Sequence, residues 1–207
     1  MNIAIFASGR GTNFSAIAAA IKKRLIKANL SLLVCDKPGA KVLLKARRAK
    51  VEIFLVERKG FSSKIDFENA IIDALKKHKI DLIVLAGFMR ILSARFVRKY
   101  YGRIINIHPS LLPSFKGENG IKDAFSYSVK VTGVTVHFVD VLMDHGPIIL
   151  QQAVNVDEGD TQKSLEEKIH RVEHALYPQA IKLFSEGKLK IKGRKVSIHR
   201  SGRSVIR

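Results

Sequence analysis

The sequence predicts an α/β fold: one domain with a mostly parallel, twisted sheet and helices on both faces. In the first half, short apolar runs alternate with segments of helical spacing. Residues 81–86 are continuously apolar, apart from the first, as in parallel strands that are buried on both faces. The length of 207 residues suits a single domain with a sizeable core. We therefore expect residues 1–207 to form one domain that ends in a basic hairpin and tail at about 187–207.

Composition indicates a globular protein without a membrane span. Hydrophobic residues make up 46% and charged residues 27% of the chain. No apolar run approaches the roughly 18 residues that a membrane span needs, and residues 1–7 have no basic leader. Cys35 is the single cysteine, so no internal disulfide is possible. We expect a cytoplasmic protein in which this thiol, set in an apolar strand, is inert.

The formal net charge of +19 raises the question of nucleic-acid binding, but its distribution argues against it. Residues 22–50 carry ten Lys/Arg and one acid, and residues 187–207 carry eight Lys/Arg and no acid. Neither stretch contains the interleaved aromatic residues on which single-stranded bases stack. We expect a solvated basic surface that can attract small polyanions, and no nucleic-acid partner.

The first strand, at 2–7, leads through a glycine-containing turn at 8–13 into a helix at 14–25. Two glycines permit a tight turn, and Thr12 or Asn13 is expected to cap the helix. Amides and the helix dipole would face one point there, so the pattern predicts a phosphate site. It is neither the dinucleotide fingerprint nor the Walker loop, and many β–α turns without a ligand share it.

The alternation continues with strands expected at 30–35 and 52–56, before the apolar strand already noted. A basic helix is expected at 40–49 and an amphipathic helix at 62–78. Strict alternation of this kind implies parallel strands joined by right-handed crossovers. The apolar face of the second helix is expected to comprise Ile65, Ala70, Ile72 and Leu75.

The most informative stretch is 103–113, which follows a short helix that Ser93 is expected to cap. Asn106 and His108 lie two residues apart on its strand, so their side chains share one face. Pro109 has no amide proton for the ladder and ends the strand. Ligands of open parallel sheets bind at the carboxyl ends of strands. This window alone fits a ligand site and a polar strand end with local hydrogen bonds equally well.

After residue 113 the regular alternation gives way to a loop and longer runs. None of these repeats an earlier segment, and no linker separates them from the first half. The elements expected in order are a helix at 122–129, β-rich runs at 131–139 and 148–156 with a connector at 140–147, a long helix at 161–184 capped by Thr161, and a basic hairpin near 189–196.

The run Asn-Ile-His-Pro-Ser-Leu-Leu-Pro at 106–113 resembles the signature of the formyltransferases that use 10-formyltetrahydrofolate. Asp144, just before Gly146 and Pro147, is similar to the third member of their Asn–His–Asp set. The turn at 8–14 and the run at 86–92 narrow the resemblance to the phosphoribosylglycinamide (GAR) formyltransferases of purine synthesis. It covers nearly the whole chain, and it implies a Rossmann-like fold and formyl transfer from 10-formyltetrahydrofolate to GAR.

The chemistry that this resemblance implies matches the three residues. Formyl transfer to an amine passes through a tetrahedral oxyanion, so it needs hydrogen-bond donors and two substrates held together. The Asn106 amide and a protonated His108 would donate to that oxyanion. Asp144 would favour the charged imidazole. The substrate supplies the nucleophilic amine, so we expect no catalytic serine or cysteine and no metal.

The resemblance also implies the substrate contacts. Gly11, Thr12 and Asn13 would hold the GAR phosphate, in agreement with the anion-site argument, and Glu173 would reach the ribose hydroxyls. The pterin of the folate would lie beside Asn106, along the main chain of a four-residue segment that consists of Met89, Arg90, Ile91 and Leu92. Arg90 is expected to act through its backbone.

The chain departs from the family pattern at two places on the folate side. Lys64 stands where we expect an arginine, so bidentate recognition of a folate carboxylate is lost. The loop at 116–122 lacks the histidine that is common in the family.

For three further histidines, a functional role has to be weighed against a purely structural one. His137 lies in an apolar run, where a core histidine with a satisfied ring is a better interpretation than a proton carrier. His170 and His174 share a helix face at i and i+4, which is compatible with metal binding. Formyl transfer has no use for zinc, so we favour a structural interpretation of this pair.

Two other classes of function remain open at this point: another folate-dependent formyl-handling enzyme, and a nucleic-acid-binding module. Methionyl-tRNA formyltransferase is expected to carry an added C-terminal domain, and formyltetrahydrofolate deformylase a regulatory domain before the first strand. A nucleic-acid-binding module on an α/β scaffold would show strongly salt-dependent binding and would leave the Asn–His–Asp set without a purpose. The expected partners are the two small substrates, and the protein is expected to be a monomer or a homodimer.

Overall fold

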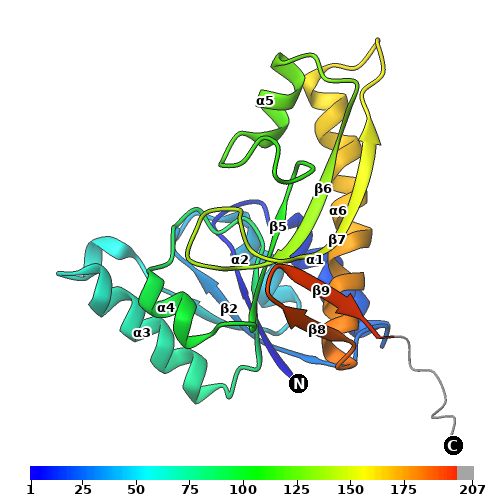
Figure 1. Cartoon of the computed structure of the whole chain (residues 1–207). Coiled ribbons are helices and arrows are strands. Elements are labelled where there is room, and N and C mark those ends of the chain that lie inside the picture. The colour runs from blue at the N-terminus through cyan, green and yellow to red at the C-terminus, as the bar shows by residue number, and fades with distance from the viewer. Residues whose placement is uncertain (200–207) are drawn as a thin grey trace, which may run out of the picture.

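The structure is a computed structural model that describes residues 1–199 (Figure 1). It is built on a nine-stranded sheet with the order β3-β2-β1-β4-β5-β6-β7-β9-β8. The strands are β1 (Asn2–Phe6), β2 (Asn29–Cys35), β3 (Glu52–Leu55), β4 (Leu82–Leu85), β5 (Ile104–His108), β6 (Val131–Phe138), β7 (Ile148–Asn155), β8 (Leu189–Lys192) and β9 (Lys195–Ile198).

The strands from β3 to β5 are parallel to one another, whereas β6 is antiparallel to both of its neighbours, β5 and β7. This confirms the mostly parallel sheet. Strand β1 lies between β2 and β4. The chain runs from β1 to β2 and β3 on one side and then returns to β4 and β5 on the other, so the strand order reverses at β1. A crevice forms at such a switch point, outside the carboxyl ends of the strands. The turns after β1 and β4 therefore meet there.

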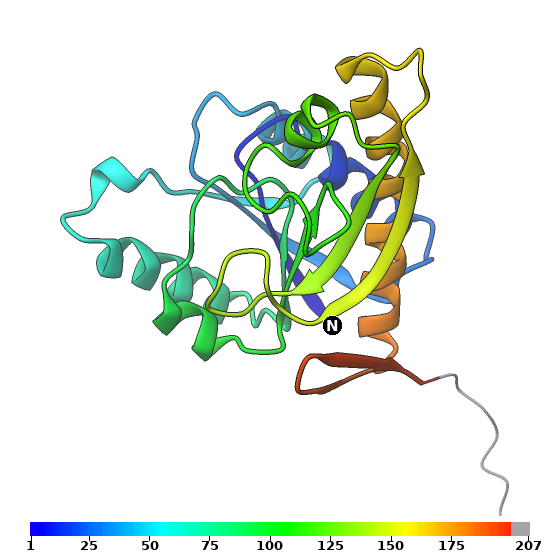
Figure 2. The ribbon, with the colours of Figure 1, turned by 45° about the horizontal axis from the view of Figure 1, so that its top comes forward.

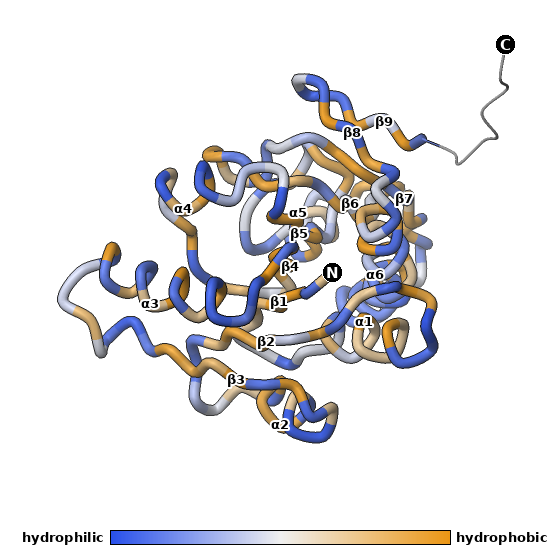
Figure 3. The backbone as a smooth tube through the Cα atoms, turned by 90° about the horizontal axis from the view of Figure 1, so that it is seen from below, coloured by the Kyte–Doolittle hydropathy of each residue, from blue (hydrophilic) through white to orange (hydrophobic). Residues whose placement is uncertain are grey.

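Helices cover both faces of the sheet, as predicted. Alternate side chains of β1 explain this: Ile3 and Ile5 pack in one core, and Ala4 and Phe6 in the other. The first core lies under α1, α2 and α6 and the second under α3 and α4, which Figure 3 shows on opposite sides of the apolar strands. The helices are α1 (Thr12–Lys22), α2 (Lys41–Arg48), the 3₁₀ helix η1 (Arg58–Gly60), α3 (Lys64–Lys77), α4 (Ala94–Lys99), α5 (Gly120–Ser126) and α6 (Gln162–Ser185).

The start of α1 corrects one expectation. Neither Thr12 nor Asn13 caps the helix: Gly11 is the N-cap, and no side chain accepts from the first turn. Gly11 has φ 68°, a left-handed conformation that glycine adopts readily, and a Cβ there would lie 2.5 Å from Cγ2 of Val42. The tight packing of α2 against the turn thus requires glycine. The amides that begin α1 have no side-chain acceptor and can bind an anion.

Helix α3 corrects a second expectation. Ile65 is exposed, and the buried face carries Phe67 and Ile71 together with Ile72 and Leu75. Ile65 lies two residues before Phe67, which on a helix turns it toward the other side. The same face buries a charged residue, Glu68, that the hydrophobic pattern did not indicate.

The caps predicted at Ser93 and Thr161 are present, and so is the C-terminal hairpin. Ser93 accepts from the amide of Phe96 at the start of α4, and Thr161 caps α6. Strands β8 and β9 form the basic hairpin, which lies beyond the end of α6 (Figure 2). The remainder of the predicted tail, 200–207, lies outside the described residues. Within the described part of the chain, none of the helices combines the length and the apolar character that crossing a bilayer requires.

Candidate active site

A cavity of about 580 Å³ opens at the carboxyl ends of β1, β4 and β5, where the strand order predicts a crevice. Its wall includes the turn after β1, the segment after β4, the end of β5, the loop before β7 and one face of α6. Lys64 is not part of the wall and is exposed at the start of α3. The structure brings the other predicted site residues together in this wall: Gly11, Thr12, Asn13, Met89, Arg90, Ile91, Leu92, Asn106, His108, Asp144 and Glu173.

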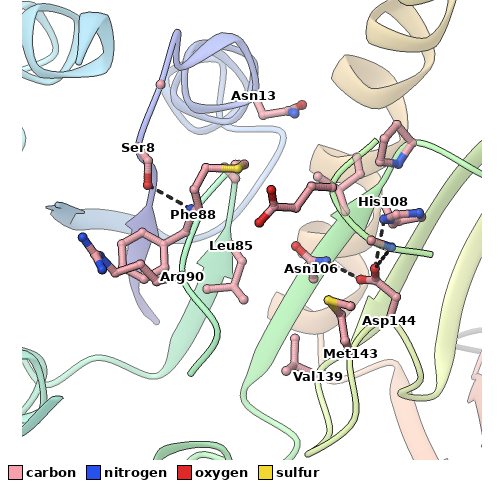
Figure 4. A pocket seen from close by; sticks show the side chains of 18 of the residues that line it. Ser8, Asn13, Leu85, Phe88, Arg90, Asn106, His108, Val139, Met143 and Asp144 are labelled. Atoms are coloured by element: carbon pink, nitrogen blue, oxygen red, sulfur yellow. Dashed lines mark hydrogen bonds and ion pairs between the residues drawn. The ribbon is translucent and has the colours of Figure 1, made fainter. Parts of the chain in front are cut away.

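The end of β5 places Asn106 and His108 side by side in the cavity, as their spacing predicts (Figure 4). His108 is 3% exposed. Its Nδ1 lies 3.4 Å from Oδ2 of Asp144, and its Nε2 lies 2.7 Å from the carbonyl oxygen of Phe115. Both ring nitrogens thus face oxygen acceptors, and a protonated imidazole is the form that donates to both.

Asp144 reaches this pair from the loop between β6 and β7. Its Oδ2 accepts from the amide of Gly117 at 2.9 Å, and its Oδ1 accepts from Nδ2 of Asn106 at 3.5 Å. Burial alone would raise the pKa of Asp144. The His137 ring, the Gly117 amide and positive charge on His108 outweigh burial and bring this pKa below its usual value. The carboxylate is therefore an anion beside the imidazole at neutral pH.

His137 belongs to the same cluster, which sequence reasoning missed. It is buried, as expected of a core histidine, and Nδ1 lies 2.8 Å from the carbonyl oxygen of Phe138. Its Nε2, however, lies 3.3 Å from Nδ2 of Asn106 and 3.7 Å from Oδ1 of Asp144. The antiparallel register of β5 and β6 pairs Asn106 with His137 and so produces this contact.

The turn after β1 forms the opposite end of the cavity. Nδ2 of Asn13 donates to Oε2 of Glu173 at 3.1 Å, which joins the turn to α6. Among the described residues, Oδ1 of Asn13 is buried and has no hydrogen-bond partner. An unpaired buried acceptor next to free helix amides is a place where a polar ligand would gain hydrogen bonds.

A network of charged residues on α6 adjoins that turn. His170 Nδ1 lies 2.8 Å from Oε2 of Glu173 and Nε2 lies 3.2 Å from Oε1 of Glu166. Arg10, which sequence reasoning did not single out, crosses from the turn to bond Glu166 and lies 3.0 Å from Nε2 of His170. Hydrogen bonding to Glu173 is the main cause that raises the pKa of His170.

The histidine pair predicted on α6 is present, with the rings of His170 and His174 stacked at 6.1 Å. The nitrogens of His170 face carboxylates, while Nε2 of His174 is buried without a partner in the described structure. Burial lowers the pKa of His174. Within residues 1–199, no three His, Cys, Asp or Glu residues gather as a metal site would require.

The segment after β4 forms a third wall, whose side chains are partly apolar. Met89 and Ile91 are exposed, and Leu142 and Met143 are exposed on the loop that carries Asp144. Apolar side chains next to a free main-chain edge suit a flat heterocycle with alternating donors and acceptors. Arg90 lines the cavity, yet its guanidinium turns away from Asn106, as Figure 4 shows.

Comparisons with a family model and with known proteins all point to formyl transferases. A family model described as formyl transferase matches residues 1–181. The phosphoribosylglycinamide formyltransferase of Bacillus subtilis (strain 168) is 49% identical over 86% of this chain and 92% of its own length. That of Escherichia coli (strain K12) is 38% identical over 92% of this chain and 90% of its own length.

A solved structure agrees with these sequence relatives. Glycinamide ribonucleotide transformylase 1 from Symbiobacterium toebii superposes with a TM-score of 0.93 at 41% identity, over 96% of this chain and 93% of its own. The match extends along nearly the whole chain, so it includes all three walls of the cavity. The chain therefore belongs to the formyl transferase family and is an enzyme of the phosphoribosylglycinamide formyltransferase type.

Proposed function

We propose that this enzyme transfers the formyl group of 10-formyltetrahydrofolate directly to the amine of GAR, with Asn106, His108 and Asp144 as the catalytic residues. The observation that supports it most is the position of these three side chains in one cavity, between an anion-binding turn and a main-chain edge for a heterocycle. A transferase that joins two substrates needs this arrangement, because the amine and the formyl carbon must be held in contact.

The reaction begins when the amine nitrogen attacks the formyl carbon. A carbon–nitrogen bond forms, and the carbonyl oxygen becomes an oxyanion. Nδ2 of Asn106 donates to that oxygen. The Nε2–H of protonated His108 donates to it as well, in place of its contact with the carbonyl oxygen of Phe115, while Nδ1 stays on Asp144. Asp144 stabilises the charged imidazole.

Collapse of the intermediate breaks the bond between the carbon and N10 of the folate. The attacking nitrogen loses one proton and N10 gains one, so no external acid is consumed. His108, paired with Asp144, manages this proton transfer. The products are formyl-GAR and tetrahydrofolate, and no covalent enzyme intermediate is formed.

The two substrates approach from different walls. The GAR phosphate binds the amides of Gly11, Thr12 and Asn13, and Glu173 binds the ribose hydroxyls. The pterin binds the main-chain edge of the segment Met89 to Leu92 beside Asn106. Lys64 lies outside the cavity wall, where it attracts the carboxylates of the folate tail as a point charge, without the bidentate geometry of arginine.

An absorbance assay with a chromophoric analogue of 10-formyltetrahydrofolate tests the proposal. We expect turnover with GAR present and none without it, and formyl-GAR in the product mixture by mass spectrometry. Release of formate without GAR would instead identify a deformylase. Asn106→Ala is expected to lower kcat by roughly 10²–10³, the range for loss of one oxyanion donor. The matched variant Asn155→Ala changes an exposed residue of β7 outside the cavity and is expected to retain full activity.

A further inference from the structure

Two buried acids in this protein lie outside the cavity wall and still contact the site. Three acidic residues are buried in the described chain: Asp36, Glu68 and Glu173. Glu173 lines the cavity, but Asp36 and Glu68 do not. These two come from the end of β2 and from α3, and both bond the same short segment, residues 89–93, that follows β4.

Asp36 holds the first end of this segment. Its side chain is 1% exposed, and its Oδ2 accepts from Nε of Arg90 at 2.6 Å. Its Oδ1 accepts from the hydroxyl of Ser8 at 2.5 Å, and that hydroxyl accepts in turn from the amide of Met89 at 3.0 Å. The Arg90 guanidinium also lies 5.6 Å from the centre of the Phe67 ring. Figure 4 shows the resulting direction of Arg90, away from Asn106.

Glu68 holds the other end. Glu68 is 1% exposed, and its Oε1 accepts from the amide of Ser93 at 2.7 Å, while its Oε2 accepts from the hydroxyl of the same serine. That hydroxyl also caps α4 by accepting from the amide of Phe96. The segment is thus bonded through side chains at both ends, and no regular secondary structure supports the residues between them.

Stability alone does not explain this use of charge. Burial of a carboxylate is costly, and well-packed apolar side chains often replace a buried ion pair without loss of stability. The two carboxylates instead fix orientation: Asp36 orients the Arg90 guanidinium, and Glu68 orients the Ser93 amide. The residues between the two fixed ends line the cavity, and Ile91 is 72% exposed.

The contact through Ser8 reaches further than the segment itself. Ser8 begins the turn that leads to Gly11, and its amide donates to the carbonyl oxygen of Gly87 at 2.9 Å. The hydroxyl of Ser8 therefore connects Asp36, the turn after β1 and the segment after β4. Glu68 has no such connection to the turn among the bonds of the described structure.

We propose that Asp36 and Glu68 are positioning residues that fix residues 89–93 in the shape that binds the flat heterocycle of the folate cosubstrate. Asp36 also joins this edge to the phosphate-binding turn through Ser8. The inference rests on the proposed function, because the ligand is the cosubstrate assigned there. It predicts an asymmetry: loss of Asp36 affects both subsites, whereas loss of Glu68 affects the folate side alone.

The test compares Asp36→Asn and Glu68→Gln with the wild type by separate titrations of GAR and of a non-reactive folate analogue. A loosened edge loses the equivalent of about one hydrogen bond to the heterocycle, so folate affinity is expected to weaken about tenfold in each variant. GAR affinity is expected to fall about threefold in Asp36→Asn, a smaller loss because the turn keeps its own helix amides, and to remain unchanged in Glu68→Gln. At saturating folate, kcat stays close to the wild-type value.

Two further variants keep the outcome interpretable. Asp73→Asn removes an exposed acid of α3 and is expected to change neither affinity. If Asp36→Asn does not fold, Arg90→Met breaks the same ion pair from its partly exposed partner and is expected to weaken folate binding alike. Folate affinity that stays unchanged, or equal losses for both ligands in both variants, would overturn the inference. A wild type that binds folate but turns over no GAR would contradict the proposed function instead.

Discussion

Oδ2 of Asp144 lies 3.4 Å from Nδ1 of His108 and accepts a hydrogen bond from the amide of Gly117. The carboxylate therefore bridges the end of β5 and the loop that follows it. The same loop places the carbonyl oxygen of Phe115 2.7 Å from the other ring nitrogen of His108. The imidazole, the carboxylate and the loop form one hydrogen-bonded unit. A change in any of them is therefore expected to alter the hydrogen bonding of the His108 ring.

Asp144→Asn is expected to lower kcat on the order of 10²–10³, as for loss of one group that stabilises the transition state. The carboxamide keeps the size of the side chain but removes the charge that favours a protonated His108. KM for both substrates is expected to change little, because in the proposed mechanism Asp144 acts through His108 on the transition state and binds neither the phosphate nor the pterin. Steady-state kinetics measures both constants. Asp73→Asn removes an exposed acid as a control, and a near-normal kcat in Asp144→Asn would exclude the assigned role.

His137→Gln is expected to lower kcat about tenfold, a smaller effect because His137 acts through Asn106 and Asp144 and not on the substrate. Nε2 of His137 helps to keep the pKa of Asp144 low. Without the ring, the pKa of Asp144 is expected to rise, and the acid limb of the kcat–pH profile to move to higher pH. A shift of this limb separates positioning from a purely structural role. An unchanged profile with a lowered melting temperature would show that His137 serves the core alone.

Much of this site was readable from residue spacing. Asn106 and His108 share a face because strand side chains alternate, and Pro109 marks the point where the strand stops. The alternation of apolar runs with helical segments predicted the parallel half of the sheet. In such folds ligands bind where the strand order reverses. These inferences depend only on the local periodicity of side chains, which can be read from a single sequence.

Contacts that depend on register or on distant segments were not readable. His137 meets Asn106 through an antiparallel pairing that nothing in either strand specifies locally. Arg10 and Glu166 meet across 156 positions of the chain. Glu68 was missed for a different reason: a glutamate in an amphipathic helix indicates an exposed position unless its partner, here Ser93, is known.

Glu166→Gln is expected to lower the KM for GAR about threefold, since exposed ion pairs are weak. Arg10 is bonded to Glu166 in the structure, and both line the cavity near the turn after β1, which we propose binds the phosphate. Without the carboxylate, the guanidinium is free to pair with a phosphate, and one repulsive charge is lost. The gain is expected to shrink as salt is added.

The matched variants sharpen this prediction. Arg10→Gln is expected to raise the KM for GAR and to leave the KM for folate unchanged. Glu167→Gln changes the next residue of α6, which is exposed and does not line the cavity, and is expected to have no effect. If Glu166→Gln and Glu167→Gln shift the KM for GAR equally, general charge and not the Arg10 contact is responsible.

His170→Gln is expected to cost more thermal stability in mild acid than in base. Glu173, assisted by Glu166 and opposed by burial and Arg10, raises the pKa of His170 in the folded protein. A raised folded-state pKa means that the native protein binds the proton more tightly than the unfolded chain. The stabilisation is therefore complete below about pH 6.5, the ordinary histidine pKa, and is lost as the pH rises through the folded-state pKa.

Melting temperatures of wild type and variant at about pH 6 and pH 9, on either side of the histidine titration, measure this effect. Other titrating groups contribute equally to both proteins, so the difference between them isolates His170. His199→Gln, at the exposed end of the C-terminal hairpin, controls for the loss of a histidine as such. A deficit of the same size at both pH values would mean that His170 contributes through packing on His174 and not through its charge.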